Sequence, residues 1–70
     1  MTEFAVGQYV EVLVQFQTES GADIDAGTRA VVRIIDPTRP LADIYLVEFL
    51  RNERTTGERG WLRGIDVLAA

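Results

Sequence analysis

Four arginines lie close in sequence to the single tryptophan, and these side chains are the strongest candidates for binding a partner. The cluster comprises Arg51, Arg54, Arg59, Arg63 and Trp61. Guanidinium groups beside an aromatic ring can follow a nucleic-acid backbone while bases stack on the ring, or they can form the rim of a protein contact. Glu53 and Glu58 interrupt the cluster, and the net charge is −4, whereas nucleic-acid modules concentrate positive charge on one face. A protein contact is therefore the first hypothesis, and nucleic-acid binding through these side chains is the alternative.

One carboxylate could support acid–base chemistry. Glu48 lies between Val47 and Phe49 in an apolar run, and an inward-facing carboxylate there could act as a general acid or base. We favour an outward position, paired with an arginine of a neighbouring strand such as Arg33. Ser20 is the only serine, and the chain has no histidine to activate it. An oligomeric enzyme with a site between subunits is the third hypothesis, and we expect a protein that is not an enzyme.

The chain offers few ligands for a metal or cofactor. It has no cysteine and no histidine, which excludes disulfides and the usual zinc, haem and iron–sulfur sites. Asp23 and Asp25 share a polar segment with Glu19, but calcium needs six to eight oxygen ligands. We therefore expect no metal and no cofactor.

Short apolar runs separated by polar, glycine-bearing or proline-bearing breaks predict an all-β domain. Alternation of Val10, Val12 and Val14 is typical of a half-buried strand. The predicted strands are Val10 to Phe16, Thr28 to Asp36, Ile44 to Leu50, Arg59 to Arg63 and Val67 to Ala69. Residues 17–27 form a long polar loop from which Ile24 returns to the core, and residues 51–58 form a charged loop that turns at Thr56 and Gly57. A proline-bearing break at 36–40 ends the second strand, and Gly64 to Asp66 form one helical turn.

Strand alternation also assigns the apolar residues to two faces. The predicted core comprises Val10, Val12, Val14, Ala30, Val32, Ile34, Val47, Phe49 and Val67. The apolar residues that fall opposite this core are Leu13, Val31, Ile35, Leu46 and Leu50. Several such side chains exceed what a soluble monomer usually exposes. They predict a homodimer or a docking surface for a larger partner, unless loops and the segment 4–6 cover them.

Four segments carry a resemblance to a known fold. Residues 6–12 resemble the xGxxVxV opening of SH3-like barrels, residues 26–32 their second strand, residues 45–49 their YxVxF strand, and Trp61-Leu62 with Asp66-Val67 their closing segment. Ala30 departs from this pattern, which usually has a second glycine. The spacing is similar to the electron-transport accessory group (photosystem I subunit IV, the variable chain of ferredoxin–thioredoxin reductase and the nitrile hydratase beta-subunit barrel) and to uncharacterised bacterial stand-alone barrels.

This resemblance implies a small five-stranded SH3-like barrel, with one short helical turn before the last strand, over a single domain spanning residues 1–70. In signalling barrels a tryptophan on the fourth strand lines a groove for proline-rich peptides. Here residues 17–27 contain no aromatic side chain, so that groove would be incomplete.

The sequence thus predicts a non-enzymatic protein-interaction module, either a small accessory subunit or a self-associating barrel that forms a homodimer or a higher oligomer. The predicted contact residues are Leu13, Ile35, Leu46, Leu50, Trp61, Arg51, Arg54 and Arg59. The sequence contains no run of 18 apolar residues and no basic N-terminal segment. We therefore expect a cytoplasmic protein with no membrane contact.

Overall fold

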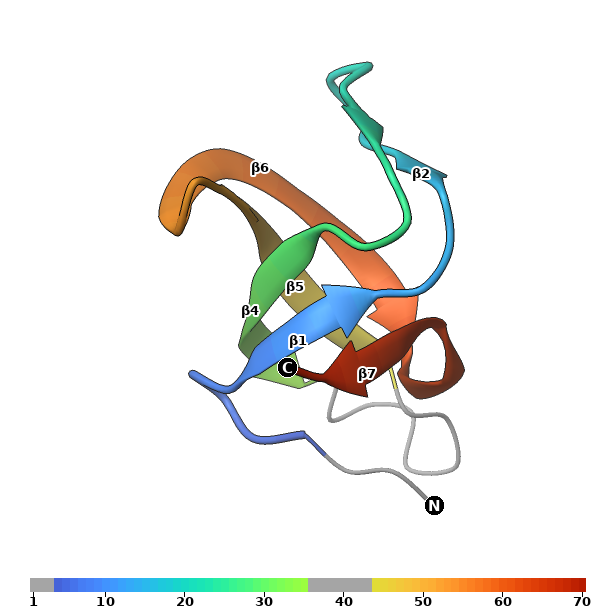
Figure 1. Cartoon of the computed structure of the whole chain (residues 1–70). Helices are drawn as coiled ribbons and strands as arrows, with labels where there is room; N and C mark the ends of the chain where they lie inside the picture. Colours follow the sequence, from blue (N-terminus) through green and yellow to red (C-terminus); the bar gives the residue numbers. More distant parts are fainter. Residues whose placement is uncertain (1–3, 36–43) are drawn as a thin grey trace.

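The structure, a computed structural model, describes residues 4–35 and 44–70, and within them the chain is all-β apart from one short turn of 3-10 helix. The elements are β1 (Tyr9–Val12), β2 (Phe16–Gln17), β3 (Asp23–Ile24), β4 (Arg29–Ile35), β5 (Ile44–Arg51), β6 (Arg54–Arg63), η1 (Gly64–Asp66) and β7 (Val67–Ala69). Five strands form one antiparallel sheet in the order β6-β5-β4-β1-β7, and β2 pairs with β3 in a separate hairpin (Figure 1). The predicted end of the second strand at 36–40 lies outside the described residues.

The closed five-stranded barrel is a prediction that needs correction. The described residues contain seven strands in two sheets, and β6 and β7 are the two edges of the larger sheet. The extra strands arise because the predicted loop 17–27 folds on itself, with Phe16 opposite Ile24 and Gly21 turning the chain at φ 91°. Since Phe16 belongs to this hairpin, the first strand of the main sheet ends at Val12. The helical turn at 64–66 before the last strand is confirmed.

The connection between β5 and β6 is tighter than predicted. Asn52 and Glu53 both have positive φ, at 52° and 64°, as in the two-residue turns that match the twist of a hairpin. The turn therefore lies here, and the predicted turn at Thr56 and Gly57 is wrong. Gly57 instead lies where the register shifts, because Glu48 pairs with Arg59 whereas Leu50 pairs with Thr55. β6 thus continues through the segment that was expected to be a loop.

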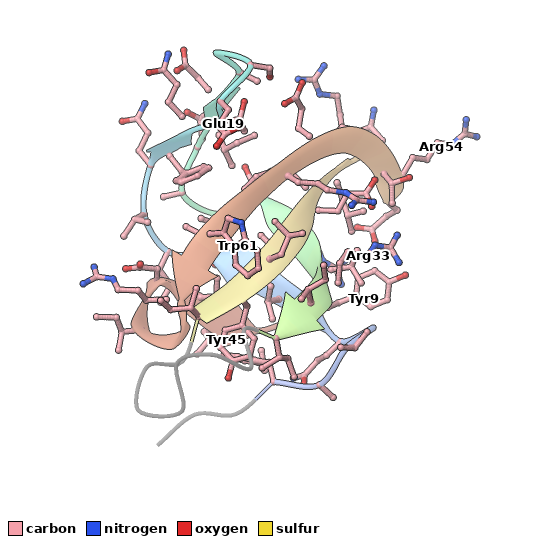
Figure 2. All side chains as sticks on the ribbon, turned by 180° about the vertical axis from the view of Figure 1, so that it is seen from behind. Tyr9, Glu19, Arg33, Tyr45, Arg54 and Trp61 are labelled. Atoms are coloured by element: carbon pink, nitrogen blue, oxygen red, sulfur yellow. The ribbon has the colours of Figure 1, made fainter. Side chains whose placement is uncertain are left out.

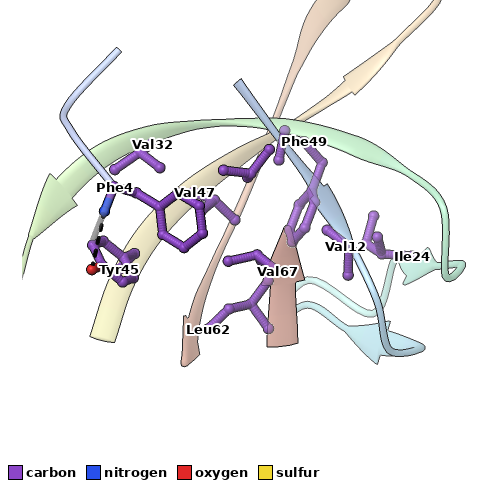
Figure 3. Packing of buried hydrophobic residues seen from close by; sticks show 11 residues of the cluster. Phe4, Val12, Ile24, Val32, Tyr45, Val47, Phe49, Leu62 and Val67 are labelled. Atoms are coloured by element: carbon purple, nitrogen blue, oxygen red, sulfur yellow. Dashed lines mark hydrogen bonds between the residues drawn. The ribbon is translucent and has the colours of Figure 1, made fainter. Parts of the chain in front are cut away.

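The core lies on the inner face of the large sheet (Figure 3). Most of the predicted core residues are buried there, namely Val10, Val12, Ala30, Val32, Val47, Phe49 and Val67. The same cluster includes Phe4, Ile24, Tyr45 and Leu62, so the predicted return of Ile24 to the core is confirmed. Phe4 packs edge-on against Tyr45 at 5.4 Å between ring centroids, and its backbone N–H donates to the Tyr45 hydroxyl. The segment before β1 thereby closes one end of the core.

Two predicted core residues, Val14 and Ile34, are exposed, at 39% and 45%. Val14 follows the end of β1, so strand alternation no longer determines its direction. Ile34 changes face because the register shifts by one residue between Val32 and Ile34, which places Ile34 opposite Leu46. This bulge moves a large apolar side chain from the core to the outer face.

The 3-10 turn between β6 and β7 is fastened by its flanking side chains. The guanidinium of Arg63 donates to both carboxylate oxygens of Asp66, at 3.0 and 3.3 Å. This hydrogen bond, together with the charge attraction, raises the pKa of Arg63 above its usual value. The backbone N–H of Leu13 donates to the Asp66 carbonyl at 2.8 Å, which links the end of β1 to the turn.

Candidate functional site

An apolar row crosses three strands on the outer face of the sheet. The register places Leu46 of β5 opposite Trp61 of β6 on one side and opposite Ile34 of β4 on the other. Trp61 is 50% exposed, Ile34 is similarly exposed and Leu46 is partly buried. Figure 2 looks onto this side of the molecule, with Trp61 beside β5 and β6. We call these three residues the Trp61 face.

A cluster of three charged side chains lies next to the Trp61 face. Glu48 follows Leu46 on the same side of β5 and is only 7% exposed. Its Oε1 accepts a hydrogen bond from Arg33 Nε at 3.0 Å and lies 3.9 Å from Arg59 Nη2. The interpretation of Glu48 as an outward carboxylate paired with Arg33 is confirmed. Because two guanidinium groups share one carboxylate, this triad carries one net positive charge.

A groove with a volume of about 300 Å³ separates the β2–β3 hairpin from β6. One wall belongs to the hairpin and the other to β5 and β6, and the lining residues are Phe16, Gln17, Glu19, Leu46, Arg59, Gly60 and Trp61. Leu46 and Trp61 belong both to this groove and to the Trp61 face. The groove and the face therefore form one continuous surface that is bordered by Arg59.

The hairpin reaches this position because residue 60 has no side chain. A Cβ built on Gly60 would lie 2.7 Å from Phe16 Cζ and 3.3 Å from Phe49 Cε2. The ring of Phe16 thus occupies the space above Gly60, and it packs against Phe49 at 5.8 Å between centroids. Only glycine allows the ring to approach this closely.

Glu58 of β6 fastens the tip of the hairpin. Its Oε2 accepts hydrogen bonds from Ser20 Oγ at 2.6 Å and from Thr18 Oγ1 at 3.1 Å. Thr18 is buried, and its Oγ1 in turn accepts from the backbone N–H of Ala22 at 3.1 Å. One carboxylate therefore holds both hydroxyls of the hairpin tip against the large sheet.

Replacing Glu58 by alanine should loosen the hairpin. Hydrogen bonds to a charged acceptor are worth more than neutral ones, about 1.5–3 kcal/mol each where they are sheltered, and Ser20 is exposed. We therefore expect a loss of about 1–2 kcal/mol in local stability and roughly tenfold faster amide exchange over residues 18–24, measured by NMR.

The matched control for this change is Glu53→Ala, which removes a carboxylate bonded to Arg29 at 2.7 Å on the exposed surface. Exposed pairs contribute about 0–1 kcal/mol, and the Glu53 carboxylate bonds to Arg29 on β4, outside the hairpin. Equal exchange rates over residues 18–24 in the two variants would contradict the role given to Glu58.

A second hollow, of about 510 Å³, lies on the other side of the hairpin. Its lining residues are Ala22, Asp23, Ile24, Asp25, Thr28, Phe49, Leu50, Arg51, Thr56 and Glu58. Leu50 is 8% exposed, so it is not the exposed contact residue that the sequence predicted. Val31 was also expected on the surface and is buried. Val31 lies opposite Glu48 on β5, and Leu50 lines this hollow beside Phe49 and Thr56.

The structure brings together only part of the predicted contact set. Leu46, Trp61 and Arg59 meet at the groove. Ile35 is exposed at the end of β4, and Leu13 is exposed beside the 3-10 turn. Arg51 and Arg54 flank the β5–β6 turn, away from Trp61, as Figure 2 shows for Arg54.

Sequence reasoning missed Ile34, Phe16, Gly60 and Glu58. Phe16 and Gly60 are far apart in sequence, and no periodic signal links them. The bulge that turns Ile34 outward also cannot be predicted from the order of apolar residues. Only Glu58 offered a signal, as an acidic residue inside an arginine-rich segment.

Within residues 4–35 and 44–70, no three acidic side chains lie close enough together to hold a metal ion. In the same part of the chain, no helix has the length and apolar character needed to cross a membrane. Comparisons with family models, curated proteins and solved structures found no match to the chain. Its function must therefore be argued from the geometry.

Proposed function

We propose that the chain is a non-enzymatic protein-interaction module, a small accessory subunit or a self-associating domain, whose contact surface is the Trp61 face. The observation that carries this proposal is the half-exposed indole of Trp61 in a row with Leu46 and Ile34. Exposed apolar patches rimmed by polar groups mark contact sites, and tryptophan and arginine are enriched among the residues that dominate binding energy. Arg59 and Arg33 provide such a rim.

The strand arrangement supports the further proposal that the fold is SH3-like. A short hairpin is inserted between β1 and β4, and a 3-10 turn precedes the last strand, which pairs with the first. This order of strands agrees with the resemblance of the sequence to SH3-like barrels. Because the similar proteins of the electron-transport group are accessory subunits, we expect an accessory role for this chain as well. The analogy concerns architecture, so the contact surface is argued from its own residues.

The state of the arginines favours a protein over a nucleic acid as partner. Among the arginines of the nucleic-acid hypothesis, Arg59 shares Glu48 with Arg33, and Arg63 pairs with Asp66. Arg51 and Arg54 flank the β5–β6 turn, away from Trp61, so they do not form one positive face with the indole. Guanidinium groups held by carboxylates are less available to phosphates, which supply most of the affinity in nucleic-acid binding. Nucleic-acid binding is therefore kept as an outcome of the test.

Affinity capture from a lysate of the native host, with and without nuclease, tests the proposal. We expect a stoichiometric protein that survives nuclease, and we expect Trp61→Ala to weaken its capture by at least about tenfold, because a central tryptophan often contributes 2 kcal/mol or more. Ile65→Ala is the control, since Ile65 is the most exposed large apolar residue described and lies on the 3-10 turn.

The outcomes of this capture separate the hypotheses. Recovery of the chain alone, dependent on Trp61, would assign the face to self-association. Recovery of nucleic acid alone, or of a partner that Trp61→Ala retains in full, would overturn the proposal.

A further inference from the structure

We infer that the outer face of the large sheet binds the same face of a second copy of the chain, so that the two sheets pack against each other in a symmetric dimer. This inference rests on the proposed function, names the partner and extends the contact beyond the Trp61 face. Three features carry it: the apolar surface of the outer face, the arrangement of its charges and the area that a stable contact needs.

The apolar surface continues from the Trp61 face onto β1. Val31 of β4 lies opposite Glu48 on one side and opposite Tyr9 of β1 on the other, so the Tyr9 side chain lies on the same face as Glu48. Tyr9 is 51% exposed, about as much as Trp61. Figure 2 shows Trp61, Arg33 and Tyr9 together on this side of the molecule. Two half-exposed aromatic side chains therefore lie on one face, and large apolar side chains that gather in this way mark a contact site.

Charged side chains on the outer face form two triads of opposite sign. The triad beside the Trp61 face, in which two arginines share one carboxylate, has a charge of +1. In the second triad Arg29 bonds to Glu53 at 2.7 Å and lies opposite Glu11 in the β1–β4 pair, which gives a charge of −1. Arg29 and Glu11 are each two positions along their strands from the Val31–Tyr9 pair, so they lie on the same face. The charges of the two triads cancel.

This arrangement selects a second copy as the occupant. A two-fold contact between identical faces requires a face that is complementary to itself. A face with one positive and one negative triad meets this requirement, because the positive triad of each copy can lie toward the negative triad of the other. A strongly acidic or strongly basic partner would instead bring one of the triads against a like charge, which costs binding energy.

The charges on the other side of the described chain do not suit such a contact. Apart from the neutral pair of Arg63 and Asp66, the described charged side chains outside the outer face are four carboxylates and two guanidinium groups, a net charge of −2. They belong to Glu19, Asp23, Asp25, Glu58, Arg51 and Arg54. Three of these carboxylates lie on the hairpin side, in the lining of the 510 Å³ hollow. Two copies can therefore meet through their outer faces without net repulsion there, although each chain has a net charge of −4.

The area of a stable contact requires more than the Trp61 face. Standard interfaces bury about 800 Å² on each partner, which is about one sixth of the 4779 Å² accessible surface of the chain. The three side chains of the Trp61 face are too few for this area, because a fully buried aromatic side chain supplies only about 150–250 Å². Two sheets that pack face to face, about 10 Å apart, would add β1 and both triads to the contact.

The test is sedimentation equilibrium of the full chain over a range of concentrations. We expect a dimer, with twice the monomer mass of 7.8 kDa, to predominate at about 100 µM, because interfaces of standard size bind in the micromolar range or more tightly. Ile34→Lys places a charge on the outer face and should weaken dimerisation by at least about tenfold. A circular dichroism spectrum like that of the parent chain would show that this variant is folded.

Leu13→Lys is the matched control for Ile34→Lys. Leu13 and Ile34 are both 45% exposed, and the substitutions add the same charge. Leu13 lies beside the 3-10 turn, where its backbone N–H donates to the Asp66 carbonyl, and it does not belong to the Trp61 face or to either triad. Its replacement should change dimerisation by less than about twofold.

A second pair of variants tests the charge balance. Glu11→Lys and Glu19→Lys each change the net charge of the chain from −4 to −2, which reduces the repulsion between whole chains. Only Glu11→Lys gives the outer face a charge of +2, so it should weaken dimerisation by at least about threefold at about 0.01 M salt, where charges act over about 30 Å. Glu19→Lys on the hairpin should leave the dimer as tight as the parent or tighter.

Three results would overturn the inference: a chain that stays monomeric at about 1 mM, equal weakening by Ile34→Lys and Leu13→Lys, or dimers of equal strength for Glu11→Lys and Glu19→Lys at low salt. A monomeric chain that still captures a different protein through Trp61 would leave the proposed function in place. A captured protein that Trp61→Ala retains in full would remove the proposed function itself, so the two failures can be told apart.

Discussion

Phe49→Ala should remove a large part of the stability of the domain, from about a third to all of it, at 25 °C. Phe49 is 1% exposed, lies opposite Ala30 and packs against the ring of Phe16. Truncating a buried phenylalanine typically costs about 3–5 kcal/mol. A domain of 70 residues has a total stability of only about 4–10 kcal/mol at ordinary values per residue. The free energy of unfolding, from urea titrations followed by circular dichroism, should fall by about 3–5 kcal/mol or become too small to measure.

The control for this loss is Leu68→Ala on β7, where an exposed leucine is removed. Its free energy of unfolding should stay within about 0.5 kcal/mol of the parent chain. A Phe49→Ala protein with the same urea midpoint as this control would show that the core does not centre on Phe49.

Gly60→Ala should displace the hairpin without a change in polarity or charge. The added methyl group would meet the Phe16 ring and the Phe49 ring edge, and inserting one methyl into a packed site costs about 1–3 kcal/mol. We expect a loss of that size in the free energy of unfolding, with NMR shifts concentrated in the hairpin and in the groove. Phe16 should yield first, because it is only partly buried whereas Phe49 is enclosed.

A second substitution distinguishes this clash from a general sensitivity of β6. Phe16→Leu reduces the side chain that faces Gly60, so the double variant should lose less stability than the two single changes summed. Such coupling is measured by a double-mutant cycle. Strict additivity of the two free energies would contradict the contact between Phe16 and residue 60.

Alternation along the chain predicted most of the inner face of the sheet. Val10 and Val12, and Val47 and Phe49, repeat with period two and are buried as expected. Ile34 breaks the pattern because a bulge inserts one residue, and nothing in the order of apolar residues reports an inserted residue. The turn at Asn52 and Glu53 was missed because neither position holds glycine, although both have positive φ.

The candidate site could be predicted only in part, because it depends on contacts between distant segments. Leu46 emerged from alternation as an outward position, whereas Trp61 was selected as the single tryptophan on the predicted fourth strand, and the register places the two opposite each other. The hairpin that forms the other wall of the groove depends on Phe16 meeting Gly60, and on hydroxyls near residue 20 meeting Glu58. Such pairings follow from the folded backbone and not from any local pattern.

The most direct test of the central claim uses the fluorescence of Trp61, which is the only tryptophan in the chain. The captured partner, in a form that has no tryptophan, is titrated into the native chain while the emission maximum of the indole is recorded. If the Trp61 face is the contact surface, the half-exposed indole becomes buried, and its emission moves to shorter wavelength in a saturable manner. An emission maximum that stays unchanged while the partner is fully bound would contradict the account.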